Sequence, residues 1–375
     1  MMVDLSEYIR WLGRFTFDEL PLSEADALVM CVISYFDLTA AAGTGDRPVT
    51  LADCSDAHAA GRITLQITGG DMGNGEIFRA ACASRRFGGL RLEDYENILR
   101  TDPPIQFSAV TLSWRDRFSF IAYRGTDETI PGWREDFMIS FIETDAQRLA
   151  AEYARRAVTS GRKWYIGGHS KGGNLALYAA CRLEDQAWDA VERVFILDGP
   201  GLCPEVMDTS VIRRIDGKAT RIIPKYSVVG RLFEPQITDT RIVRSSQKGI
   251  LEHSLATWGV EYSELAYAEE NDHQSVLLMQ ILNHWISTLD RDARMTLTAD
   301  LFDTLSAGGA VTLSDIAGGG RESFAAVLVR MFRTSSITKK VIRELPAQAL
   351  STVWKQLLHE TGEEEPADQP AASNI

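Results

Sequence analysis

One short segment places a serine among neighbours that suit covalent catalysis. Gly168-His169-Ser170-Lys171-Gly172 has a glycine two positions before and two positions after the serine. A nucleophile elbow needs this spacing because its serine sits on a strained turn between a strand and a helix, where side chains at both positions would clash. The spacing therefore predicts that Ser170 is presented for attack on a carbonyl carbon.

The residues around this segment fit such a turn. Residues 163–167 are mostly apolar and predict a short strand, and residues 174–181 are rich in Ala and Leu and predict a helix. The alternative is a glycine-rich loop with an incidental serine. We expect His169, beside the serine, to be a packing residue.

A serine hydroxyl is a weak nucleophile near neutral pH and needs a base. Hydrolases that use this turn carry serine, acid and histidine in that chain order. The order leaves His253, His273, His284 and His359. The second and third fall in a predicted helix and the fourth borders the C-terminal end, whereas His253 lies in a predicted loop. We therefore expect His253 to be the base, with a structural loop histidine as the alternative.

One aspartate is well placed to orient that base. Asp198 follows the apolar run 194–197 and precedes Gly199-Pro200-Gly201. Its carboxylate is thus predicted at the carboxyl edge of the sheet, where catalytic groups gather in open α/β folds. The next predicted strand ends at residue 226, and residues 226–228 contain no carboxylate. The alternative is that Asp198 only caps a turn.

Acyl transfer also requires hydrogen-bond donors for the oxyanion. One is usually the backbone N–H just after the nucleophile, which belongs to Lys171. For the second we predict the turn Tyr123-Arg124-Gly125-Thr126, with Thr126 as donor. A plain glycine turn is the alternative.

The segment after that turn, residues 127–143, carries more apolar side chains than a plain surface loop. We expect part of it to cover the serine, with Ile130 and Trp133 lining an acyl pocket. The alternative, that these residues form a core helix against the sheet, suits residues 137–142 better.

These side chains must be held by a framework in which strands and helices alternate. Predicted helices cover residues 20–38, 75–85, 91–100 and 144–160, and predicted strands cover 107–114, 118–123, 193–197 and 220–226. Ser23 and Asp26 could form a capping box at the start of the first helix. The alternation indicates an α/β fold with a mainly parallel sheet and helices on both faces.

The chain changes character after about residue 260. We predict an α/β core over residues 1–260, and a helical extension packed on it over 261–360, with helices at 271–290, 292–306, 322–334 and 339–359. Residues 361–375 are acidic and rich in Pro and Ala, which predicts a disordered tail.

Composition excludes several function classes. The 375 residues are 45% hydrophobic and 24% charged, which suits a large globular core, and no apolar run is long enough for a membrane span. The N-terminus does not resemble a signal peptide, so we expect a cytoplasmic protein without stable membrane insertion. A net charge of −13 argues against nucleic-acid binding. Five scattered cysteines suggest buried thiols rather than disulfides or zinc, and no metal or organic cofactor is implied.

Several motifs together resemble known families. They are Phe15-Thr16-Phe17, Asp26-Ala27-Leu28, Arg124 to Asp127 with Trp133 to Asp136, Gly168 to Ala176, Asp198 to Gly201, Ile223-Pro224, Ser227 to Gly230, and His253 with Trp258. The 122–126 segment and the serine motif resemble class 3 lipases, and the whole set more closely resembles the bacterial Mbeg1-like proteins. This resemblance covers roughly residues 5–290 and implies an α/β-hydrolase fold with a Ser170, His253 and Asp198 triad. The chain differs from class 3 lipases at position 227, where it has a serine and those lipases are expected to carry the acid of their triad.

The sequence thus predicts a serine hydrolase that cleaves a small-molecule carboxylic ester or thioester through an acyl-enzyme on Ser170. Two alternatives stay open. An acyltransferase would use the same triad, and a non-catalytic interaction protein would use the same scaffold. The sequence does not indicate an oligomeric state.

Overall fold

The structure is a computed structural model that describes residues 2–41, 48–67, 71–101, 104–126, 138–296 and 298. The chain separates into two units, Met1–Met279 and Gln280–Ile375. The first contains every residue proposed above for catalysis.

A seven-stranded sheet organises the first unit. Its strands are β2 (Arg91–Thr101), β3 (Pro104–Trp114), β4 (Phe118–Tyr123), β5 (Lys163–His169), β6 (Val191–Leu197), β7 (Ala219–Pro224) and β8 (Thr240–Val243). Spatial order follows chain order, with antiparallel pairing from β2 to β4 and parallel pairing from β4 to β8. The strands predicted at 107–114 and 118–123 and the mainly parallel sheet are confirmed.

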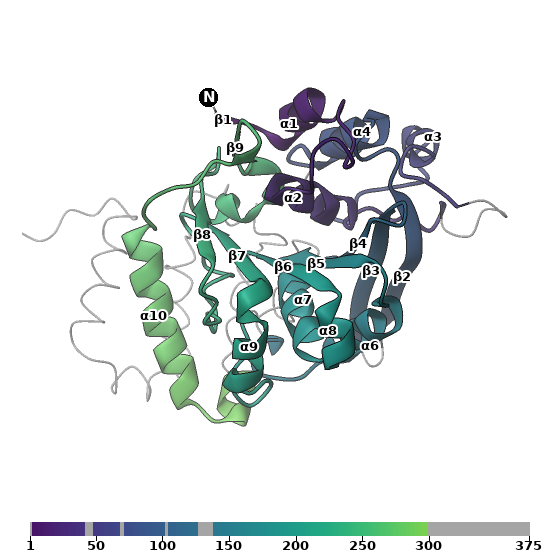
Figure 1. The fold of residues 1–375 in the computed structure, drawn as a ribbon. Coiled ribbons are helices and arrows are strands. Elements are labelled where there is room, and N and C mark those ends of the chain that lie inside the picture. The colour runs from purple at the N-terminus through teal and green to yellow at the C-terminus, as the bar shows by residue number, and fades with distance from the viewer. Residues whose placement is uncertain are drawn as a thin grey trace, which may run out of the picture. The chain divides into compact units, whose positions relative to one another are not determined.

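Helices cover both faces of this sheet (Figure 1). The connections between parallel strands contain α6 (Asp145–Ala157), α7 (Lys171–Cys181), α8 (Asp185–Asp189) and α9 (Thr209–Ile215). Because right-handed crossovers that advance in one direction place their helices on one face, another segment must cover the opposite face. That cover is the N-terminal group α1 (Leu5–Leu12), α2 (Glu24–Ile33), α3 (Cys54–Ala59) and α4 (Asn74–Ala83). The architecture is an α/β-hydrolase fold.

Helix α2 is the centre of the N-terminal cover. The predicted capping box is present, since the Ser23 side chain accepts from the Asp26 N–H and the Asp26 carboxylate accepts from the Ser23 N–H. The helix is shorter than the predicted span 20–38, and nine of its ten residues are buried. It therefore packs on all sides rather than along one stripe. Asp26 is fully buried and bonds Arg86 at 2.6 Å, so the charge is paired.

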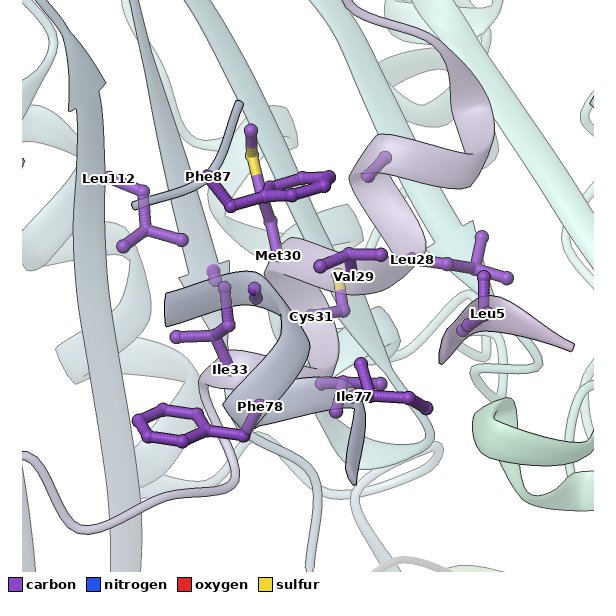
Figure 2. Packing of buried hydrophobic residues seen from close by; sticks show 14 of the residues in the cluster. Leu5, Leu28, Val29, Met30, Cys31, Ile33, Ile77, Phe78, Phe87 and Leu112 are labelled. Carbon is purple, nitrogen blue, oxygen red and sulfur yellow. The ribbon is translucent and has the colours of Figure 1, made fainter. Parts of the chain in front are cut away.

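The core lies between α2, α4 and the sheet. Figure 2 shows Leu28, Met30, Phe78 and Phe87 among its buried side chains. The Phe36 and Phe78 rings stack with centroids 4.1 Å apart. Burying a side chain of this size contributes about 1.5–3 kcal/mol, so the N-terminal helices are fixed on the sheet by packing.

The predicted helix over residues 91–100 is wrong. This segment is strand β2, which pairs antiparallel with β3 from Arg91 opposite Ser113 to Thr101 opposite Pro104. A break in register lies between Glu93 and Glu96. The local sequence suits a helix, but pairing with an adjacent long strand satisfies the backbone groups and overrides that preference.

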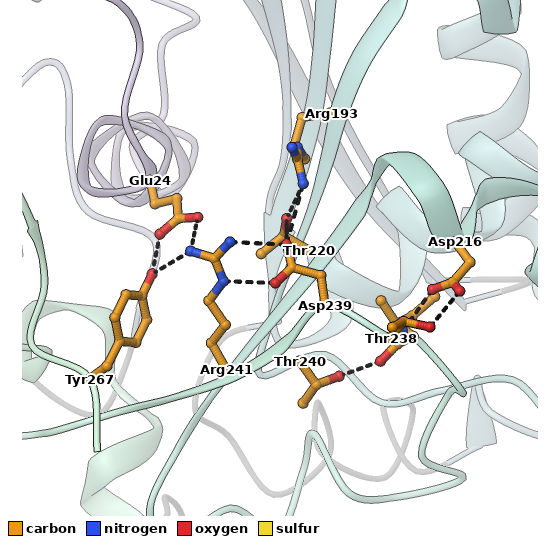
Figure 3. A network of polar contacts seen from close by, with 10 residues as sticks. Glu24, Arg193, Asp216, Thr220, Thr238, Asp239, Thr240, Arg241 and Tyr267 are labelled. Carbon is orange, nitrogen blue, oxygen red and sulfur yellow. Dashed lines mark hydrogen bonds and ion pairs between the residues drawn. The ribbon is translucent and has the colours of Figure 1, made fainter. Parts of the chain in front are cut away.

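A polar network joins α2 to the far strands of the sheet (Figure 3). Arg241 on β8 donates to Glu24 at 2.6 Å and to Asp239 at 2.7 Å. Asp239 also accepts from Thr220 on β7 at 2.8 Å, and Arg193 on β6 donates to Thr220 at 3.0 Å. The network ties the start of α2 to three neighbouring strands.

The remaining elements are short apart from the last helix. A three-stranded sheet contains β1 (Met2–Val3), β9 (Val260–Glu261) and β10 (Glu264–Leu265), and the 3-10 turns are η1 (Asp216–Lys218), η2 (Gly249–His253) and η3 (Leu255–Thr257).

The helix predicted at 271–290 is α10 (His273–Thr288), and residues 291–296 are also helical. The later predicted helices and the tail lie outside the described residues. Among the helices described, none is long and apolar enough to cross a bilayer.

Candidate active site

Ser170 occupies a tight turn between β5 and α7. Its backbone has φ 58° and ψ −127°, a conformation that costs a non-glycine residue about 1–3 kcal/mol. The Ser170 N–H donates to the Leu197 carbonyl at 3.0 Å, which ties the turn to β6. A Cβ atom at Gly168 would collide with the Gly172 carbonyl. Both glycines therefore allow the backbone to fold tightly beneath the serine.

Asp198 and His253 are in direct contact. Asp198 directly follows the neighbouring strand β6 and has φ 41°, and its Oδ2 accepts from His253 Nδ1 at 2.6 Å. The aspartate side chain is 1% exposed and the histidine side chain 12% exposed. Since the carboxylate accepts from Nδ1–H, the neutral imidazole has its lone pair on Nε2, which suits a base.

The other carboxylate oxygen is held by a loop after β7. Ser227 Oγ donates to Asp198 Oδ1 at 2.6 Å, and the Gly230 N–H donates to the same oxygen at 3.2 Å. A Cβ atom at Gly230 would collide with this oxygen. Buried Arg221 donates to the Gly230 carbonyl at 2.7 Å and so anchors the loop.

Sequence reasoning missed these supporting residues. Ser227 attracted notice because no carboxylate stood there and because it begins a family motif, and Gly230 only because it ends that motif. The signal that could have found them was the pair of a serine and a glycine three residues apart after a predicted strand.

The predicted oxyanion turn lies against the serine turn. A Cβ atom at Gly172 would collide with the Tyr123 carbonyl, and one at Gly125 would lie 2.7 Å from the His169 carbonyl. Lys171 is the first residue of α7 and directly follows Ser170. Thr126 is 6% exposed and lines the same cavity as Ser170. The two predicted donor segments are therefore neighbours in space.

Ser170, His253 and Thr126 line one small cavity of about 20 Å³. Val32, Tyr35 and Asn74 also line this cavity. They come from the N-terminal part of the chain, which the sequence analysis did not assign to the site. Ile130 and Trp133, predicted to line an acyl pocket, lie outside the described residues.

His169 makes two polar contacts. Its Nδ1 is 2.7 Å from the Tyr35 hydroxyl, and its Nε2 is 2.8 Å from the His253 carbonyl oxygen. Burial, with a smaller effect of nearby His253, lowers the pKa of His169 well below its usual 6.5. The ring is therefore neutral at pH 7. Packing alone, which the sequence predicted, does not describe this residue.

The cysteine thiols are poor candidates for the nucleophile. All five cysteines are buried and free, and burial raises the pKa of each. Thiols with raised pKa values are poor nucleophiles. No group of three or more metal-binding side chains occurs among the described residues.

Comparison with known proteins gives one family. A solved structure described as M37 lipase is similar, at 13% identity and a TM-score of 0.35, over 56% of this chain and 70% of that chain. Among curated proteins, none matches. The family model named Mbeg1-like matches residues 81–303, which is more than half of the chain and includes Ser170, Asp198 and His253. The chain belongs to the Mbeg1-like family.

Proposed function

We propose that the protein is a serine hydrolase that cleaves a carboxylic ester or thioester through an acyl-enzyme on Ser170. One observation carries the proposal. His253, whose Nδ1 contacts Asp198 at 2.6 Å, lines the same cavity as a serine held on a strained turn between a strand and a helix. Base, orienting acid and nucleophile are the three groups that acyl transfer by serine needs.

In the first half of the reaction, His253 Nε2 takes the proton of the Ser170 hydroxyl while Oγ bonds to the substrate carbonyl carbon. The carbonyl oxygen becomes an oxyanion, and the N–H groups of Lys171 and Thr126 stabilise it. His253 then gives its proton to the departing alcohol or thiol as the carbon–oxygen or carbon–sulfur bond breaks. The acyl group stays on Ser170.

In the second half, a water molecule replaces the alcohol. His253 takes a proton from the water, whose oxygen attacks the acyl carbon, and then returns that proton to Ser170 Oγ as the acid leaves. Asp198 stays ionised throughout, because its role is to hold the Nδ1–H tautomer and stabilise the imidazolium. Its own position is secured by Ser227 and the Gly230 N–H.

A fluorophosphonate probe tests the proposal without a known substrate. We expect stoichiometric labelling of the wild-type protein, with the adduct mapped to Ser170 by mass spectrometry. Ser170→Ala should not be labelled, whereas Ser210→Ala, which removes an exposed serine at the start of α9, should be labelled at the wild-type rate. An unlabelled wild-type protein that also cleaves none of a panel of p-nitrophenyl esters would contradict the proposal and favour a non-catalytic role.

A further inference from the structure

We propose that Tyr35 is a positioning residue that acts through His169 to fix the backbone carbonyl of His253. The inference rests on the proposed function, because it concerns how the base is held. It extends the site beyond the triad to a residue that follows α2.

The direction of each hydrogen bond follows from the chemistry of the groups. A carbonyl oxygen can only accept, so His169 Nε2 must carry a proton and donate to the His253 oxygen at 2.8 Å. In the neutral ring, Nδ1 then has a lone pair and accepts from the Tyr35 hydroxyl at 2.7 Å. Tyr35 thereby selects the tautomer that can hold the His253 carbonyl.

The Tyr35 hydroxyl has little freedom to leave this place. Tyr35 follows α2 and is 4% exposed. Its backbone carbonyl accepts from the Gln66 N–H at 2.8 Å. A Cβ atom at Gly125 would collide with the hydroxyl, so the absence of a side chain at Gly125 makes room for it.

His253 is held both through its side chain, which contacts Asp198, and through its backbone carbonyl, which accepts from His169. His253 ends the short turn η2, and Asp198 binds its Nδ1. Holding the carbonyl as well limits rotation of the residue, and so limits movement of Nε2. Small displacements of a catalytic group cost large factors in rate.

A neutral His169 also suits the chemistry. The rings of His169 and His253 are 4.5 Å apart by centroid. A charged His169 would repel the imidazolium that forms on His253 during the reaction. The hydrogen bond from the Tyr35 hydroxyl to the Nδ1 lone pair stabilises the neutral form of His169, because a protonated Nδ1 could not accept it.

Tyr35→Phe tests this arrangement, with the rate constant of fluorophosphonate labelling at Ser170 as the readout. The variant keeps the ring but removes the donor, so His169 can place its proton on Nδ1 and turn a lone pair toward the His253 carbonyl. We expect labelling to slow by about tenfold to a hundredfold, as expected for a loosened catalytic group. The matched control is Tyr153→Phe, which removes a buried hydroxyl that contacts Thr111 at 2.9 Å and should change the rate less than twofold.

Variants of His169 separate positioning from simple destabilisation. His169→Gln keeps an amide donor near the place of Nε2 and does not depend on Tyr35 to select a tautomer. It should retain most of the wild-type rate, whereas His169→Phe should lose at least as much as Tyr35→Phe. Adding Tyr35→Phe to either His169 variant should cause no further loss, because the two residues act in series.

The outcomes are separable. Wild-type protein that is not labelled would overturn the proposed function itself. If the wild type is labelled and Tyr35→Phe is labelled at the same rate, this inference alone would be overturned. It would also be overturned if Tyr35→Phe slowed labelling by the same factor in the His169→Phe protein as in the wild type. The melting temperatures of all variants must stay above the assay temperature. If Tyr35→Phe is unfolded at that temperature, NMR of the wild-type protein replaces the labelling assay. The nitrogen-15 chemical shifts of His169 must then show the Nε2–H tautomer, and the Nδ1–H tautomer would overturn the inference.

Discussion

The Ser227 hydroxyl donates a hydrogen bond to Asp198, with Oγ 2.6 Å from Oδ1. Ser227 stands at the position in the chain where class 3 lipases are expected to carry the acid of their triad. The loop after β7 therefore supports a carboxylate that comes from the end of β6. A serine there is compatible with Asp198 because it adds a donor, whereas a second carboxylate would add repulsion.

This relationship predicts the effect of Ser227→Ala. A hydrogen bond to a charged group contributes about 1.5–3 kcal/mol, so its loss should lower kcat/KM by roughly tenfold to a hundredfold. Steady-state kinetics on the best p-nitrophenyl ester would measure this, with Ser210→Ala as the control. An unchanged rate would mean that the Gly230 N–H is sufficient to hold Asp198 Oδ1.

Ser170→Ala should abolish turnover with little change in fold. We expect kcat to fall by about three to six orders of magnitude, because only binding and the oxyanion donors then remain. Circular dichroism would check the fold. Hydrolysis of a confirmed substrate at a near wild-type rate would rule out the mechanism.

The histidines should differ sharply in importance. His253→Ala should be nearly as damaging as Ser170→Ala, because no other group holds the base position against Asp198 in the described structure. His273→Ala and His284→Ala, both in α10, should affect stability at most. If His284→Ala lost as much activity as His253→Ala, the assignment of the base would have to be abandoned.

The buried neutral His169 should make stability depend on pH. Its pKa is lowered on folding, so between the unfolded value near 6.5 and the lower folded value the unfolded chain binds more protons. Stability should therefore fall as pH drops below about 6.5, by at most about 1.4 kcal/mol per pH unit from this group. The titratable side chains that contact the His169 ring are those of Tyr35 and His253.

Urea denaturation at pH 7.5 and pH 5.5 would measure this slope. His169→Gln should reduce the difference between the two pH values, since Gln does not titrate. The same difference in both proteins would assign the pH dependence to other groups.

Substrate preference should rise with acyl length over the first few carbons. Ile130 and Trp133 lie outside the described residues. We propose that they bury the acyl chain of the substrate, and each buried methylene would contribute about 0.8 kcal/mol of binding free energy. Kinetics on acetyl, butyryl and octanoyl esters would measure this. A steady preference for acetyl, unaffected by Trp133→Ala, would remove the pocket and leave the hydrolase mechanism standing.

Features that depend on neighbouring residues could be predicted from the sequence. The strand, turn and helix around Ser170 could be predicted because glycine spacing and apolar periodicity are local properties. The place of Asp198 could be predicted because a residue that ends a buried parallel strand must emerge at one edge of the sheet.

Features that depend on pairing between distant segments could be identified only in the folded protein. Residues 91–101 form β2 because β3 offers backbone partners, which local propensity cannot reveal. Tyr35 reaches His169 across 134 positions of chain, because packing of α2 on the sheet sets that distance. No periodicity or spacing records such a contact, since it exists only after the two layers have packed together.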